Sequence, residues 1–213
     1  MSAAAEQTPG DPLATDVGLR ELLDVSSLEG VLSSFYALFQ IPIRILDANG
    51  RALAKNRKQP ALSEYLNGLP GGAERLGALY ETLKQSEPGE DGQFSLTSFS
   101  GASYHVAAIA HDGRRIGRVV LGPFLMSGTT ELPHELEAAA PQLDATRLRE
   151  LLGALPRVRQ ETIRAISRHL GVTLDALLFA GHKAWLTEAM HLSAVQESFR
   201  ELSEKAQLLE QAE

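Results

Sequence analysis

SYHVAAIAHDGRRIGRVVLGPFL, residues 103–125, is the stretch that decides the fold. Two runs rich in Val, Ile and Ala flank Asp112-Gly113, and Asp-Gly between such runs is a strong signal for a two-residue β-hairpin turn. With that turn, His111 pairs with Arg114. The pairing then continues outward to Ile109 with Ile116, Ala107 with Arg118, and Val106 with Val119.

The two faces of this hairpin differ in polarity, because successive side chains of a strand point to opposite sides of the sheet. A three-residue loop with a bulge would shift the register and exchange the faces. We expect the apolar face to point into the interior; it comprises Tyr104, Val106, Ala108, Val119 and Leu121, with Gly117. The other face comprises His105, His111, Arg114 and Arg118, with Ile109, Ile116 and Val120.

Small residues on the interior face predict unfilled space. Ala108 and Gly117 would lie opposite each other, where a filled core usually has Val or Ile. The space is either a cavity for a small, largely apolar ligand or a flat spot covered by a helix side chain such as Phe35 or Phe39. The ligand-binding hypothesis names the five interior-face residues and, as possible polar anchors at the mouth, Tyr36 or Tyr65.

The segments before the hairpin predict an α+β fold. Apolar side chains recur at helical spacing after a plausible N-cap at Ser26 or Ser27, and the period then changes from 3.6 to 2. The expected elements are a helix at 26–40, strands at 41–47 and 51–56 around an Asn49-Gly50 turn, helices at 63–69 and 74–85, and a strand at 94–100. This order predicts a PAS-like five-stranded antiparallel sheet with helices on one side, although profilin-like and GAF-like sheets share it.

The composition narrows the function classes. The chain has 213 residues, a net charge of −7 and no cysteine, which argues against a generic nucleic-acid binder and excludes disulfides and thiolate chemistry. No signal peptide or membrane-spanning run is visible, so we expect a cytoplasmic protein without a membrane span. The expected organisation is a flexible tail at 1–17, a PAS-like core at 18–130, a helical extension packing on the core at 131–186, and a coiled-coil helix at 187–213.

Residues 161–184 resemble a helix-turn-helix with Gly171 in the turn. The recognition helix would be 174–183, which offers Leu, Ala and Phe where base-reading side chains are needed. The apolar stripe also continues through Gly171, which costs a helix about 1 kcal/mol without ending it. We therefore predict a single long helix from about Gln160 and no nucleic-acid binding.

The end of the chain has the spacing of a two-stranded coiled coil. Apolar residues are separated by three and four residues in alternation, which is the a/d pattern. We expect this helix to form a parallel homodimer; its core positions are Leu192, Val195, Phe199, Leu202, Ala206 and Leu209. The alternative is a helix that packs back on its own domain.

No arrangement of catalytic residues stands out. The sequence has no GxSxG, phosphate-binding loop, dinucleotide fingerprint or Ser/His/Asp arrangement. His111-Asp112 is interpreted as a turn rather than part of a metal site, because no second cluster of ligands is apparent; His105 and His111 on one strand face are a weaker possibility. We expect no enzymatic activity, no cofactor and no metal.

Two segments, residues 41–54 (IPIRILDANGRALA) and residues 103–125, resemble the PocR-type sensory domain, a PAS-like module of bacterial signalling proteins. The resemblance implies that the chain is a cysteine-free, divergent member of this family. The likeness extends from about Leu22 to Leu186 and rests on the D-x-x-G turn at 47–50 and the I-G-x-x-x-x-G-P-F segment at 116–124. It implies binding of small organic molecules, often hydrocarbon derivatives, in a pocket on the sheet. It also implies a fused output module, such as the histidine kinase of a two-component system.

Many members of this family carry cysteines before and within the third strand, where this chain has residues 56–69 and 98–104 without any. A metal- or thiol-linked role is therefore not implied. The first hypothesis is a homodimeric ligand sensor that signals through its coiled coil. The alternative is a non-enzymatic dimerisation or scaffold module with a degenerate pocket. An open cavity with polar anchors favours the sensor, and a cavity filled by Phe or Trp favours the scaffold.

Overall fold

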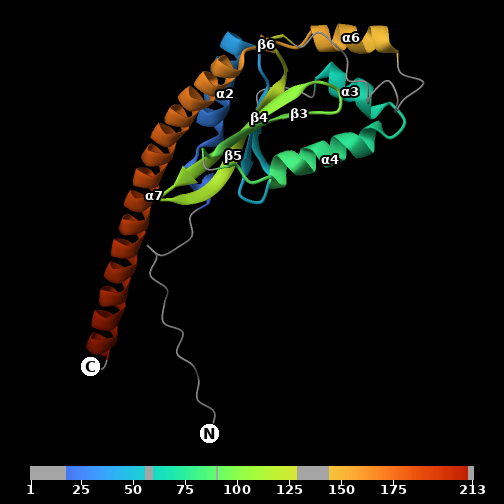
Figure 1. Cartoon of the computed structure of the whole chain (residues 1–213). Coiled ribbons are helices and arrows are strands. Elements are labelled where there is room, and N and C mark those ends of the chain that lie inside the picture. Colours follow the sequence, from blue (N-terminus) through green and yellow to red (C-terminus); the bar gives the residue numbers. More distant parts are fainter. Residues whose placement is uncertain (1–17, 56–59, 90, 129–143, 211–213) are drawn as a thin grey trace.

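A computed structural model describes residues 18–55, 60–89, 91–128 and 144–210 (Figure 1). Its centre is a twisted antiparallel sheet in the order β2-β1-β5-β4-β3, and a short sixth strand pairs with β5 in parallel. The α+β, PAS-like fold is confirmed. The strands are β1 Ile43–Asp47, β2 Ala52–Lys55, β3 Gln93–Thr97, β4 Ser103–His111, β5 Arg114–Met126 and β6 Arg157–Val158.

Helices cover both faces of the sheet (Figure 1). The expectation of helices on one side is therefore wrong. One layer contains α1 Leu19–Leu22, α2 Val25–Phe39 and the first part of α7 Gln160–Glu210. The other contains α3 Ala61–Asn67, α4 Gly72–Gln85 and α6 Ala145–Gly153.

Each layer forms its own core with one face of the sheet. On the α7 side, Leu28 and Leu32 of α2 and Ile163 and Leu170 of α7 are buried against β1 and β5. On the α4 side, leucines of α3, α4 and α6 are buried against the opposite face. Burial of apolar surface on both sides stabilises a three-layer domain and makes the central strand β5 part of both cores.

The start of α2 lies slightly before the predicted N-cap. Asp24 is the N-cap, and its Oδ2 accepts a hydrogen bond from the Ser27 amide at 2.7 Å. A carboxylate at this position satisfies a free helix amide and interacts favourably with the helix dipole. Ser26 and Ser27 therefore belong to the first turn of the helix.

The turn of the long hairpin is as predicted, but the strands beyond it are not. Asp112 and Gly113 have φ of 49° and 74°, and His111 pairs with Arg114. Ala110 then pairs with Arg115, whereas Ile109 pairs with Gly117. Ile116 is thus an extra residue in β5, a β-bulge that moves the following pairings, as far as His105 with Leu121, by one position.

The predicted unfilled space beside Gly117 is occupied. A Cβ on Gly117 would lie 2.5 Å from the Leu46 carbonyl oxygen and 2.8 Å from Cδ2 of Leu19. The alternative of a covering side chain is therefore correct at this position, although the residue is Leu19 of α1 rather than Phe35 or Phe39. The bulge also removes Ala108 from this site, since Ala108 pairs with Arg118.

α7 is one uninterrupted helix from Gln160 to Glu210, so the predicted continuity through Gly171 is confirmed. Its first half packs on the sheet and on α1, where Gly181 lies against the backbone of Leu22. Its second half runs beyond the β4–β5 hairpin (Figure 1). None of the described helices combines the length and apolar character needed to cross a membrane.

Candidate functional site

The bulge divides the predicted ligand-binding residues between the two faces of the sheet. Tyr104 and Val106 lie in the core beneath α4, whereas Val119 and Leu121 lie in the core beneath α2 and α7. Ala108 shares the side of Tyr104 and Val106, because residues two apart on a strand point the same way. The shared interior face was a wrong prediction, and a contact of any of the five with a ligand stays a prediction.

A groove lies between α4 and the β1–β2 end of the sheet, and we call it the α4 groove. Its volume is about 560 Å³, within the usual range for small-molecule sites. The sheet side is apolar and includes Leu46 and Val120. The lining residues are Arg44, Leu46, Asn49, Gly50, Arg51, Ala52, Tyr80, Leu83, Lys84 and Val120.

Among the described residues, the α4 groove is lined by three basic side chains and by no acidic one: Arg44, Arg51 and Lys84. The guanidinium of Arg44 stacks over the Tyr80 ring, 5.0 Å from its centre, a cation–π arrangement that holds the guanidinium in place. Lys84 is paired at 2.8 Å with Glu81, which lies outside the lining. The groove therefore combines an apolar floor with a positive rim.

The turn beside the groove is built by Asp47. Its Oδ1 accepts hydrogen bonds from the amides of Asn49 at 3.0 Å and Arg51 at 2.9 Å, and Gly50 takes a φ of 74° that favours glycine. The D-x-x-G turn that carried the resemblance is thus present. It holds Arg51 at the rim.

Arg118 fastens the end of α4 next to the groove. Its buried Nη1 donates to the carbonyl oxygens of Leu83 at 3.2 Å and Ser86 at 3.1 Å. These acceptors lie at the C-terminus of α4, where free carbonyls attract a cation. Burial lowers the pKa of Arg118, and the positive charge of Arg115 lowers it further. The Arg118 guanidinium nevertheless remains a cation.

His105 and Arg118 were expected on the same face of the hairpin, and this is wrong. His105 pairs with Leu121 and lies on the α7 side, whereas Arg118 pairs with Ala108 and lies beneath α4. Nδ1 of His105 is 2.8 Å from the Ser95 hydroxyl, and Nε2 is 3.2 Å from Oε1 of Gln93. Burial, followed by the charge of Arg164, lowers the pKa of His105 to about 4. His105 is therefore neutral at neutral pH.

The two tyrosines expected as polar anchors lie elsewhere. Tyr36 lines a second groove of about 830 Å³ between the C-terminal end of α2, α3 and the segment after α6. The Tyr65 hydroxyl accepts from the Asp144 amide at 3.2 Å and lies 3.4 Å from its carbonyl oxygen, which links α3 to α6. Tyr104 lies close to Tyr80 and Arg44 of the α4 groove: burial and then Tyr80 raise the pKa of Tyr104, and Arg44 lowers it.

The predicted coiled-coil residues form an exposed apolar stripe. Leu192, Val195, Phe199 and Leu202 are between 38% and 69% exposed, although apolar side chains of this size are usually covered. The side chains of Ala206 and Leu209 lie outside the described part of the structure. Dimerisation through this stripe stays a prediction.

In a comparison with known families, a family model described as "Sensory domain found in PocR" matches residues 21–182. The matched range contains the whole sheet, the α4 groove and α7 as far as His182. No curated protein matches the chain.

Proposed function

The chain belongs to the PocR family of sensory domains, and we propose that it binds a small organic anion in the α4 groove and reports the binding through α7. Membership of a sensory family favours a non-enzymatic role. The proposed ligand class rests on the side chains that line the groove in this chain.

The observation that carries the proposal is the combination of lining residues. Arg44, Arg51 and Lys84 face the groove, and its lining, as far as the structure describes the chain, contains no carboxylate, Phe or Trp. A carboxylate or phosphate at the rim would form charge-assisted hydrogen bonds, while an apolar body would cover Leu46 and Val120. This is the open, polar-anchored site expected of a sensor.

Strand β5 offers a physical route from the groove to α7. The side chain of Val120 lines the groove, whereas the side chains of Val119 and Leu121 pack in the core that contains α7. Close-packed side chains transmit small displacements, so a ligand that shifts Val120 also changes the packing of α7.

The output side of the proposal is a parallel homodimer. The exposed stripe from Leu192 to Leu202 follows the a/d order, and in that register Lys205 falls at g and Glu210 at the following e, which face each other across a parallel seam. A coiled coil this short has marginal stability on its own. The dimer therefore also uses the helix around Trp185 or the domain itself. The partner that reads it is a signalling output module, such as a histidine kinase.

A panel of small carboxylates and organic phosphates tests the ligand class through thermal stabilisation of the full chain. We expect at least one member to stabilise the wild type, and Arg44→Met to weaken its binding about tenfold or more, the loss of a hydrogen bond to a charged group. Arg149→Met, a change of the same kind at an exposed arginine of α6, is the matched control. If neutral compounds alone bind, or if Arg44→Met binds as tightly as wild type, the anion site is wrong; no binding at all favours the scaffold alternative.

A further inference from the structure

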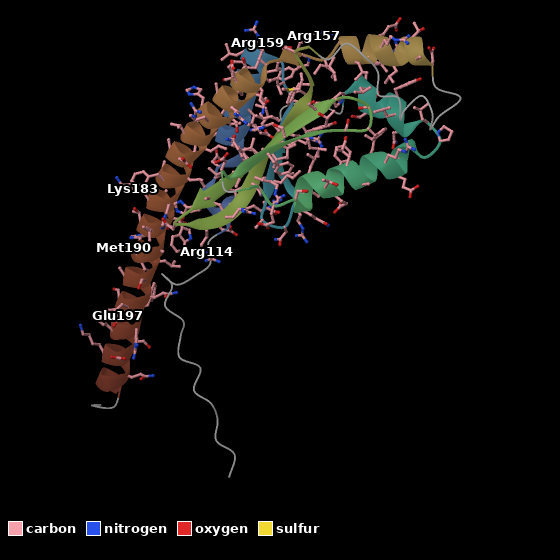
Figure 2. The ribbon with its side chains drawn as sticks, viewed as in Figure 1. Arg114, Arg157, Arg159, Lys183, Met190 and Glu197 are labelled. Carbon is pink, nitrogen blue, oxygen red and sulfur yellow. The ribbon has the colours of Figure 1, made fainter. Side chains whose placement is uncertain are left out.

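The tip of the β4–β5 hairpin meets α7 through three side chains that carry metal-ligating atoms. His111 ends β4 and Asp112 begins the turn. His182 lies on α7, 71 residues after His111 in the chain. One ligand atom from each lies within 4.8 Å of the other two. Figure 2 labels two residues that mark this region: Arg114, which follows the hairpin turn, and Lys183, which follows His182 on α7.

The distances suit a small metal ion. His111 Nε2 lies 2.8 Å from His182 Nδ1 and 3.5 Å from Asp112 Oδ2, and His182 Nδ1 lies 3.9 Å from the same oxygen. Ligands of tetrahedral zinc are about 3.3 Å apart, as follows from metal–ligand bonds of about 2.0–2.1 Å. A slight opening of the two rings, with the ring-to-ring hydrogen bond replaced by two metal bonds, brings all three distances close to this value.

We propose that His111, Asp112 and His182 form a binding site for a divalent transition metal such as Zn²⁺. Two imidazoles and one carboxylate are the ligands of zinc sites that keep one position for water. The site is open enough for a hydrated ion to enter, because Asp112 is exposed and both histidines are partly exposed.

The surroundings restrain two of the ligand residues without the metal. The turn sets the backbone of Asp112, with φ of 49° next to Gly113. The His182 ring lies beside Trp185, 6.1 Å between ring centres, and meets His111 edge-on at 4.9 Å. Ligands ordered in advance lose less conformational entropy on binding.

A metal here would connect the hairpin to α7 just before the exposed stripe. From His182 to Leu192 the helix rises about 15 Å, so the connection would restrain the direction in which the second half of α7 leaves the domain. The site lies on the α7 side of the sheet and shares no residue with the α4 groove. It is therefore independent of the proposed anion site.

Zinc binding to the full chain without an affinity tag tests the proposal, with a chromophoric chelator as competitor and Co²⁺ absorption as a report on coordination. We expect one equivalent to bind, and His182→Gln to weaken binding at least about tenfold. Asp112→Asn also weakens it, and it keeps a residue that tolerates the positive φ. His191→Gln, at an exposed histidine nine residues farther along α7, leaves binding unchanged.

Thermal unfolding gives a second readout. Zn²⁺ should raise the melting temperature of wild type and His191→Gln but not of His182→Gln. Failure of wild type to bind one equivalent, or equal affinity of wild type and both ligand variants, would leave only a hydrogen bond between two histidines and overturn the site.

Discussion

Replacing His105 by Gln should make the protein less sensitive to mild acid. His105 is 2% exposed, and its ring nitrogens contact Ser95 and Gln93. Because its pKa is about 4 in the folded protein against 6.5 as the ordinary value, the unfolded chain binds a proton between these two values and the folded chain does not. Stability contributed by neutral His105 is thus present above pH 6.5 and is lost as the pH falls towards 4.

The size of the effect follows from the two pKa values. Between pH 7 and pH 5, protonation of the unfolded state alone costs the wild type about 2 kcal/mol of unfolding free energy. Gln keeps the capacity to bond with Ser95 and Gln93 but has no proton to gain. We therefore expect His105→Gln to lose less stability over this interval than wild type by about that amount, whatever its stability at pH 7.

Urea unfolding followed by far-ultraviolet circular dichroism at pH 7 and pH 5, at one protein concentration, measures the difference. His191→Gln is the control, since an exposed histidine should leave the pH dependence of wild type unchanged. Parallel losses in wild type and His105→Gln would show that His105 titrates normally in the folded state, and the reasoning from its burial and from Arg164 would be refuted.

Two further predictions concern packing and assembly. Gly117→Ala should destabilise the fold by about 1–3 kcal/mol, because the added methyl group meets Leu19 and the Leu46 backbone; an unchanged urea midpoint would contradict the close approach. Phe199→Glu combined with Leu202→Lys should convert a dimer into a monomer by light scattering while circular dichroism still shows a folded domain, and a wild-type chain that is monomeric at high micromolar concentration would rule out the dimer.

Several elements of this fold can be predicted from local sequence patterns. The Asp112-Gly113 turn, the helical spacing of α2 and the unbroken apolar stripe through Gly171 are decided by residues close together in the chain, so elementary stereochemistry predicts them. The apolar a/d spacing after Leu192 is equally local. Whether a second chain covers it depends on association, which the spacing alone leaves open.

The faces of β5 were decided by tertiary packing. Ile116 becomes a bulge where Gly117 lies against Leu46 of β1 and Leu19 of α1, and neither neighbour is close to Gly117 in sequence. Side chains alternate between the two faces along a strand. The one extra residue therefore moved the β5 side chains after it to the opposite face relative to their β4 neighbours and placed Arg118 beneath α4. An alternating pattern with apolar residues on both faces could not reveal this.

The two candidate sites depend on long-range contacts for the same reason. The sequence by itself determined the five antiparallel strands, the two tight turns and the long helix, because these follow from backbone geometry and the spacing of apolar residues. Only the tertiary structure brought Arg44 against Tyr80 of α4 and His111 against His182 of α7. Such contacts arise when separate elements bury their apolar faces together, and the residues that meet are then set by how layers pack rather than by their spacing in the chain.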